Sequence, residues 1–237
     1  MKKSFLLLLF PLILIKIDAQ KPELILPVGH ILHASDAIYS PDERFVLTAS
    51  RSDNTAKLWE SVSGKLFRTF YSMNGFTSLS FSPDGQTIMM TTDYTDVTLW
   101  ETLTGKLLHT LRERDFVNSA SFNSHGDLAM TSTNHEIKIW DTKSGKLVQS
   151  LSDTSKISLP AFLSNENLVF YVSGNSGRMW NRSENTSRQL FNKSEYIFSC
   201  KFIDNETKIL VGGLKHVELY DRNTGVILST CRKRICS

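Results

Sequence analysis

The chain has 237 residues, of which 41% are hydrophobic and 22% are charged, a composition typical of a globular protein and not of a disordered one. Its formal net charge is +3, and this falls to +1 once the N-terminal leader described below is left out, with 24 basic residues against 23 acidic ones. A body so close to neutral argues against nucleic acid as a partner, because nucleic-acid-binding domains need a basic face.

Residues 1–19 read as a secretory signal peptide. Two lysines precede an apolar run from Phe5 to Ile15, and a polar break closes on Ala19. The run has 11 residues, fewer than the roughly 18 that a membrane-spanning helix needs. We therefore expect cleavage after Ala19, export to the periplasm or the medium, and no stable membrane insertion afterwards. Ile17 is bulkier than the small residue favoured two positions before a cleavage site, so the exact site stays open.

The rest of the chain, residues 20–237, repeats a unit of fixed length. The clearest marker is an aromatic residue at Trp59, Trp100, Trp140, Trp180 and Tyr220. The steps between these residues are 41, 40, 40 and 40. We predict one domain with five repeats at approximately 29–70, 71–111, 112–151, 152–191 and 192–231.

Each repeat predicts four short strands. The first ends in an aromatic residue before a turn, as at Ser82–Gly85, where proline presets φ at the second position and glycine suits the fourth. The second, such as residues 45–50, is almost continuously apolar, which is typical of a strand buried on both faces. The third and fourth alternate apolar and polar residues around a turn, as in Ile137–Leu151. We therefore predict an all-β protein of five four-stranded antiparallel blades, without a helix after the leader.

The order of these parts resembles the WD-repeat β-propeller family. Gly29-His30 opens the first repeat, Ser-Pro-Asp-Gly follows a first strand, and Leu58-Trp59-Glu60 and Ile139-Trp140-Asp141 stand in the third strands. The resemblance covers residues from about 23 to 231. It implies that a buried network of His, Asp, Ser or Thr, and Trp fixes each blade.

This implied network is nearly complete in the first repeat and broken in the others. The first repeat has His30, Asp53 and Trp59, although Ser50 stands one residue further back than the family pattern. The third repeat has Ser132 and Trp140, with Asn134 in place of the acid. The other repeats keep only the aromatic position, as Trp100, Trp180 and Tyr220.

The number of blades leaves alternatives open. Family members most often close with seven blades, whereas five repeats would give either a closed five-bladed ring or an open arc of a larger propeller. The segment Glu23–Leu26 could latch a ring beside residues 217–220, or the strand at 226–230 could complete the fifth blade. The chain could also be an N-terminal part of a longer exported protein, with edges that invite self-association.

No catalytic, metal or cofactor motif stands out. The six histidines are spread over four of the five repeats without zinc-ligand spacing. Only one acid, Asp36, falls three residues before a first-strand aromatic, so paired carboxylates for glycoside hydrolysis are not expected. The sequence also lacks a Gly-x-Ser-x-Gly elbow and a phosphate loop. We expect no cofactor, no metal and no catalysis.

Three cysteines are too few for a disulfide framework. Cys200 shares a strand face with Phe202 and is expected to be a small buried hydrophobe. Cys231 and Cys236 could close a short loop after export, but spacing alone does not establish the geometry of a bridge.

From these features we expect a non-enzymatic exported scaffold that presents loops to a protein or peptide partner. Two alternatives remain open. One is a secreted lectin-like propeller that binds carbohydrate. The other is the regulatory propeller of a larger exported enzyme, for example a caspase-like peptidase, whose catalytic domain is not in this sequence.

Overall fold

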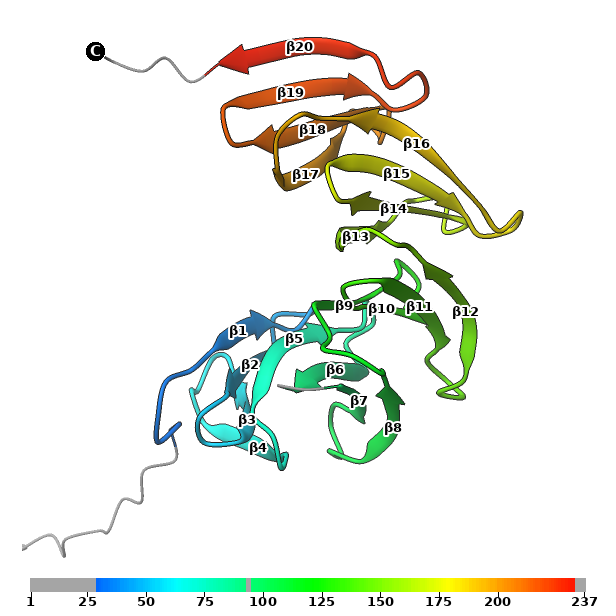
Figure 1. The fold of residues 1–237 in the computed structure, drawn as a ribbon. Coiled ribbons are helices and arrows are strands. Elements are labelled where there is room, and N and C mark those ends of the chain that lie inside the picture. Colours follow the sequence, from blue (N-terminus) through cyan, green and yellow to red (C-terminus); the bar gives the residue numbers. More distant parts are fainter. Residues whose placement is uncertain (1–28, 93–94, 233–237) are drawn as a thin grey trace, which may run out of the picture.

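The structure, a computed structural model, describes residues 29–92 and 95–232. Within these ranges the protein is all-β, with twenty strands in five antiparallel sheets of four (Figure 1). Each sheet is one blade, and its strands lie side by side in chain order. The prediction of five four-stranded antiparallel blades is confirmed.

The strands of the first three blades have the following bounds. Blade 1 consists of β1 (Asp36–Tyr39), β2 (Phe45–Ser50), β3 (Thr55–Glu60) and β4 (Leu66–Tyr71). Blade 2 consists of β5 (Phe76–Phe81), β6 (Thr87–Thr92), β7 (Asp96–Glu101) and β8 (Leu107–Arg112). Blade 3 consists of β9 (Ser119–Phe122), β10 (Leu128–Ser132), β11 (Glu136–Asp141) and β12 (Leu147–Ser152).

The last two blades follow the same plan. Blade 4 consists of β13 (Ile157–Phe162), β14 (Leu168–Ser173), β15 (Ser176–Asn181) and β16 (Thr186–Asn192). Blade 5 consists of β17 (Ile197–Ile203), β18 (Lys208–Gly213), β19 (His216–Asp221) and β20 (Ile227–Arg232). Because β20 pairs with β19, the last strand completes the fifth blade. The segment Glu23–Leu26 and the leader 1–19 lie outside the described residues, so their predicted roles stay predictions.

The turn between the third and fourth strands shows how local sequence fixes the blade. Gly145 has a φ of 68° at this turn in blade 3, a left-handed conformation that costs glycine little. Blade 4 lacks glycine there, and Asn185 takes the same role with a φ of 53°, since asparagine tolerates this region better than most residues. The recurrent Ser-Gly-Lys and Thr-Gly-Lys sequences are therefore hairpin turns.

Alternation along the strands gives each blade two faces, and blades 2 to 4 pack both of them on neighbouring blades. We call the side that packs on the preceding blade the leading face and the opposite side the trailing face. In blade 3, Ala129 and Trp140 lie on the leading face and pack with Leu99 of blade 2. Met130 and Ile139 lie on the trailing face and belong to the cluster that includes residues of blade 4. The hydrophobic core therefore lies between blades, with one cluster for each of the four joints.

A polar contact repeats at every joint on the outer side of the arc. A side chain of the fourth strand donates a hydrogen bond to a turn carbonyl of the next blade. The four pairs are Arg68 to Leu103 at 2.7 Å, His109 to Lys143 at 2.9 Å, Gln149 to Arg182 at 2.9 Å and Arg188 to Asn223 at 3.2 Å. In blade 5 the matching position is Ser229, which has a much shorter side chain.

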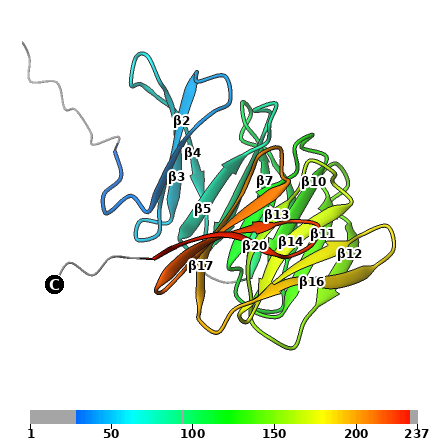
Figure 2. The same cartoon turned by 90° about the horizontal axis from the view of Figure 1, so that it is seen from above.

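The five blades form an open arc and not a closed ring. One trailing-face position is at most 1% exposed in blades 1 to 4, where it is Leu47, Met89, Met130 and Phe170, but its equivalent in blade 5, Leu210, is 38% exposed. At the other end of the arc, Tyr39 on the first strand of blade 1 is 66% exposed. Both ends of the described chain lie at the open side (Figures 1 and 2). Of the two arrangements that the sequence left open, the structure has the arc.

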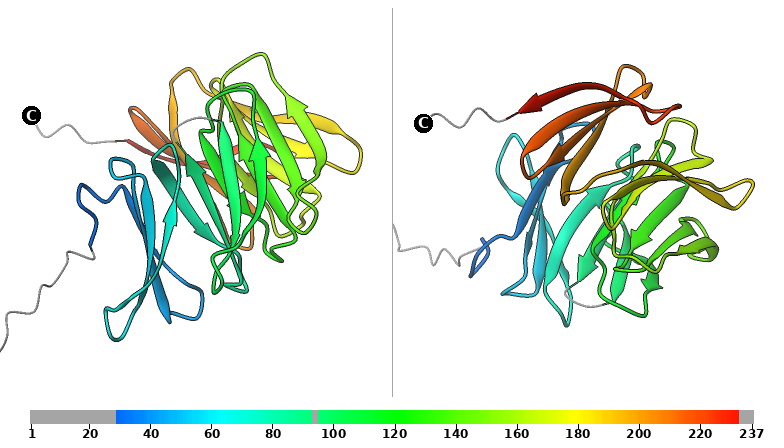
Figure 3. Two further views of the ribbon diagram at one scale, coloured as in Figure 1. Left: turned by 90° about the horizontal axis from the view of Figure 1, so that it is seen from below. Right: turned by 45° about the horizontal axis from the view of Figure 1, so that its top comes forward.

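The first strand of each blade lies on the inside of the arc. The first strands touch their counterparts across three joints, β1 with β5, β5 with β9, and β9 with β13. The fourth strands lie at the opposite edge of their sheets, on the outside of the arc (Figure 3). Residues on the first strands are therefore the ones presented to the interior of the arc.

Candidate functional site

In blade 1 the residues expected at the structural positions come together. His30 Nδ1 lies 3.0 Å from Asp53 Oδ2, and His30 Nε2 lies 2.8 Å from Thr48 Oγ1. The Trp59 indole donates to the same hydroxyl at 2.9 Å. Burial acts to raise the pKa of Asp53, but hydrogen bonds from Thr55 and His30 hold it below its ordinary value. The hydroxyl that joins the network is thus that of Thr48, which the sequence analysis did not single out.

Ser50, the hydroxyl that the sequence analysis considered, lies further along β2. Its Oγ accepts a hydrogen bond from the backbone N–H of Asp53 at 3.3 Å and helps to fix the turn that carries this acid. Val46 pairs with Trp59, and Thr48 lies two residues from Val46 on the same face of β2. Thr48 is therefore two residues closer to Trp59 along the strand than Ser50 is.

Blade 3 builds a different network around its tryptophan. Trp140 Nε1 donates to Thr131 Oγ1 at 2.8 Å, and Thr131 in turn donates to Glu113. Glu113 Oε2 lies 2.5 Å from Lys138 Nζ, and the two side chains are only 1% and 9% exposed. Glu113 thus contacts the threonine of blade 3 as His30 contacts Thr48 in blade 1, but its partner is a lysine on the third strand in place of Asp53.

Ser132 and Asn134 do not take the places that the family resemblance implied. Ser132 Oγ lies 2.9 Å from Ser119 Oγ, and Asn134 accepts a hydrogen bond from Asn118 at 3.0 Å. Successive residues of a strand face opposite sides, so Ser132 is on the trailing face while Thr131 shares the leading face with Trp140. The implied roles of Ser132 and Asn134 are corrected accordingly.

Blades 4 and 5 carry ion pairs at the same two positions as blade 3. In blade 4, Asp153 lies 3.9 Å from Arg178. In blade 5 the charges are reversed, with Lys193 Nζ 2.8 Å from Glu218 Oε2. The sequence separation is 25 residues in each blade. This spacing of opposite charges in three successive repeats is the signal from which the pairs could have been found in the sequence.

The aromatic side chains at the remaining positions differ in their hydrogen-bond partners. Trp180 donates to Asn185 at 3.3 Å, and the Tyr220 hydroxyl donates to Glu218 at 2.6 Å. Burial and the neighbouring Glu218 carboxylate both raise the pKa of Tyr220. In blade 2, Trp100 Nε1 is buried without a hydrogen-bond partner, because Met90 occupies the position of Thr48 and Thr131. These positions hold the blades together and offer no reactive group to solvent.

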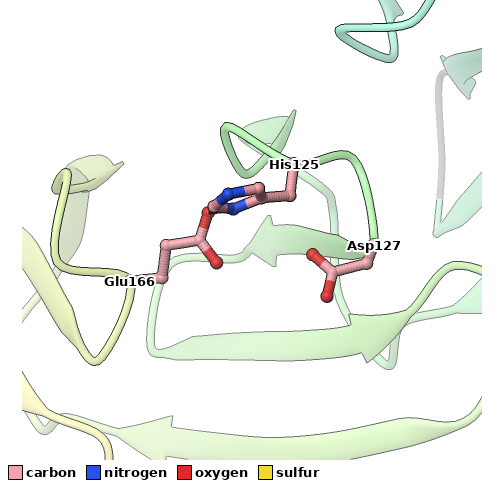
Figure 4. A group of neighbouring side chains, drawn as sticks. All are labelled: His125, Asp127 and Glu166. Carbon is pink, nitrogen blue, oxygen red and sulfur yellow. Dashed lines mark hydrogen bonds and ion pairs between the residues drawn. The ribbon is translucent and has the colours of Figure 1, made fainter.

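A second polar cluster, His125, Asp127 and Glu166, joins the turns of blades 3 and 4 (Figure 4). Their potential ligand atoms lie within 4.8 Å of one another. His125 Nδ1 lies 2.8 Å from Glu166 Oε1, and the Glu166 carboxylate raises the pKa of His125. Asn123 donates to both Glu166 and Asp127, at 2.7 Å and 2.6 Å. Because both oxygens of Glu166 already accept hydrogen bonds, the cluster works as a polar link between blades.

Three cavities that could receive a partner lie at blades 3 to 5, two of them beside the first strands. A cavity of about 390 Å³ lies between β9 and β13 and is lined by Ser119, Ser158, Leu159 and Tyr196 among others. A second cavity, of about 400 Å³, lies further along β13 beside Pro160 and Phe162. A third, of about 610 Å³, shares Tyr196 with the first and extends over β19.

Two features at this inner side are unusual. β13 is interrupted between Ser158 and Ala161, and Leu159 within the interruption has a φ of 53°, which is strained for a leucine. Tyr196 and Phe198 are 49% and 57% exposed, and their ring centroids lie 5.2 Å apart. We call Leu159, Tyr196 and Phe198 the inner patch. Backbone strain and exposed aromatic side chains both concentrate at functional sites.

The cysteines add no reactive centre within the described residues. Burial raises the pKa of Cys200 to about 12, which fits the expectation of an inert buried thiol. Cys231 is exposed, and Cys236 lies outside the described residues, so the bridge between them stays a prediction. No helix of the described part of the chain is long and apolar enough to cross a membrane.

Comparisons with known proteins identify the family. The model of the WD domain, G-beta repeat, matches residues 22–60 and 105–141. An uncharacterized WD repeat-containing protein of Synechocystis sp. is 39% identical over 59 residues, which are 24% of this chain and 17% of the relative. The chain carries WD repeats at the matched residues, and its five four-stranded blades have the fold of a β-propeller. Propellers of this family are in general protein-interaction modules.

Two solved structures share the fold of this WD-repeat protein. The structure of U3-55K matches with a TM-score of 0.69 and covers 86% of this chain and 65% of its own. The crystal structure of RRP9 WD40 repeats matches with a TM-score of 0.70 and covers 86% and 64%. Both are 18% identical in sequence, so the likeness concerns the fold alone. The chain spans less than two thirds of the length of these structures.

Proposed function

We propose that this WD-repeat protein is an exported, non-catalytic scaffold that binds a protein partner through the inner patch. The observation that carries the proposal is the pair of exposed aromatic side chains, Tyr196 and Phe198, on the inside of the arc. Aromatic residues of this kind supply most of the energy at protein interfaces, because they bury a large area at a low entropic cost.

The surroundings of the pair support a binding role. Tyr196 lines two cavities, so a partner residue that enters either one contacts its ring. The strained Leu159 lies across the first cavity from it. A rigid scaffold of packed blades holds these groups in place, which lowers the cost of ordering them when a partner binds.

The polar groups of the described residues favour binding over catalysis. The buried charges of blades 3, 4 and 5 are paired with one another inside the joints. Asp36, the one acid expected on the channel side, accepts a hydrogen bond from the backbone N–H of Leu79 at 2.9 Å and links blades 1 and 2. Export rests on the leader at residues 1–19, and N-terminal sequencing of the protein secreted by its host tests it.

Site-specific photo-cross-linking tests the binding role. A photoreactive phenylalanine replaces Tyr196 in one variant and Leu103 in a control variant, since Leu103 is 54% exposed on the β7–β8 turn, at the outer side of the arc. Cells that express each variant are irradiated, and adducts are identified by mass spectrometry. We expect a defined protein adduct at Tyr196 and none at Leu103. Equal adducts at both positions, or none at Tyr196, would contradict the proposal.

A further inference from the structure

We propose that β17 binds an extended acidic peptide segment of the partner as a fifth strand of blade 5. This inference rests on the proposed function and adds to it the chemistry of the partner. The first strand of every blade stands at the end of its sheet and has one edge without a neighbouring strand. Such an edge presents unpaired backbone N–H and C=O groups and is a template for another strand.

Four of the five inner edges have features that hinder pairing with another strand. β1 and β9 have only four residues each, which is too short for a stable ladder. On β5, the backbone N–H of Leu79 is already taken by Asp36 at 2.9 Å. On β13, the interruption at Leu159 and the missing N–H of Pro160 break the edge. Short strands, prolines and irregularities are the usual means by which proteins prevent edge pairing.

The fifth inner edge, on β17, has fewer of these features. β17 has seven residues and contains no proline, and after a register shift between Ile197 and Ser199 it pairs regularly with β18 from Ser199 to Ile203. Ser199 and Lys201 are exposed, because the described chain places no blade against the trailing face of blade 5. A peptide can therefore approach β17 from the open side of the arc.

The side chains of β17 indicate what the peptide carries. No carboxylate of the described residues forms an ion pair with Lys201. The neighbouring Lys208, in contrast, has its Nζ 2.5 Å from Asp204 Oδ2. In the other blades the position of Lys201 holds a small or apolar residue, for example Ile38, Ser121 or Ala161. Opposite charges on facing strands attract, and like charges repel. Lys201 thus selects an acidic residue, while Phe198 and Tyr196 offer an apolar contact at the beginning of the strand.

Synthetic peptides test this mode of binding on the full chain. One peptide of about ten residues, long enough for an ordinary strand, alternates valine with glutamate. A second replaces each glutamate by lysine. A third has the sequence of the first but carries N-methyl groups on alternate backbone amides, which removes the donors that pair with an edge. Affinities are measured by calorimetry for the unaltered protein, for Lys201→Glu and for Lys106→Glu, a control at an exposed lysine before β8.

We expect the acidic peptide to bind the unaltered protein about tenfold more tightly than the basic one. Lys201→Glu should reverse this preference, Lys106→Glu should preserve it, and N-methylation should abolish binding. The proposal is wrong if no peptide binds, if the N-methylated peptide binds as well as its parent, or if Lys201→Glu leaves the preference unchanged. If a partner is cross-linked at Tyr196 but these peptide tests fail, the proposed function stands and only the strand-pairing mode is wrong.

Discussion

Reversing either charge of the buried Glu113–Lys138 pair in blade 3 should lower the stability of the protein, and reversing both charges together should restore much of it. Glu113→Lys or Lys138→Glu alone places two like charges at a site where the side chains are 1% and 9% exposed. Breaking such a pair costs about 3–5 kcal/mol, and two unit charges about 4 Å apart interact by about 4 kcal/mol at an effective dielectric constant of about 20. For a domain of this size the loss corresponds to a Tm lower by about 6–20 °C.

The double variant recreates the arrangement of blade 5. There the lysine, Lys193, stands at the first position and the glutamate, Glu218, at the second, with 2.8 Å between their charged atoms. We therefore expect Glu113→Lys with Lys138→Glu to recover more than half of the stability lost. Recovery is incomplete because Glu136, 3.3 Å from the present lysine, would face the new glutamate.

Urea denaturation of the four proteins in a double-mutant cycle measures the coupling. Lys208→Glu serves as a control, since the Lys208–Asp204 pair is 36% and 61% exposed and exposed pairs contribute about 1 kcal/mol or less. A double variant that is no more stable than the less stable single variant would show that the two positions do not form the pair described, and would refute the reasoning.

Three further changes give distinct expectations. Trp140→Phe should lower the free energy of unfolding by about 1–3 kcal/mol more than Trp100→Phe, as measured by urea denaturation, because Trp140 donates to Thr131 whereas Trp100 Nε1 has no partner. Gly225→Ala should be more destabilising than Gly64→Ala in thermal melts, since both have a φ near 70° but a Cβ at Gly225 would lie 1.9 Å from the Leu190 carbonyl oxygen while Gly64 has open space; equal losses would contradict the expected clash. The pKa of His125 is raised by Glu166, so its contribution to the blade 3–4 link is present below the pKa of an unfolded histidine and is lost as pH rises through the higher folded value. An NMR titration should show the pKa of His125 fall on Glu166→Gln, and an unchanged value would mean that the link does not form.

The blade plan could be predicted from sequence because it depends on short-range patterns. The tryptophan at a nearly constant step, the alternation in Ile137–Leu151 and turns such as Ser82–Gly85 each fix a strand or a turn within one repeat. These signals repeat five times, so an error in one repeat is corrected by the others. The closure of the ring is different, because it depends on the angle between blades and on what covers Leu210, which no local pattern encodes.

The structural network was predicted only where it follows the family pattern. His30, Asp53 and Trp59 meet, but the choice of Ser132 failed by one residue, since a shift of one position along a strand moves a side chain to the opposite face. The ion pair of Glu113 and Lys138 joins positions 25 residues apart and becomes visible in the sequence only when repeats are aligned with one another.

The inner patch could not be foreseen. Tyr196 and Phe198 read as ordinary apolar residues at the start of a strand, but both are exposed, and Phe198 stands at the register shift of β17. The interruption of β13 at Leu159 likewise has no glycine to announce it. The exposure of the two aromatic side chains depends on tertiary packing, whereas Pro160 is a local sign that β13 is irregular.

The affinity for the partner captured at Tyr196 tests most directly whether the inner patch is the binding surface. Tyr196→Ala with Phe198→Ala is compared with Val62→Ala with Leu103→Ala, a matched pair of exposed apolar residues on the turns before β4 and β8. Loss of two aromatic anchors should weaken binding by at least about tenfold, with a folded chain by circular dichroism, while the control should bind as the unaltered protein does. Equal affinities for the two variants would contradict a partner site on the inside of the arc.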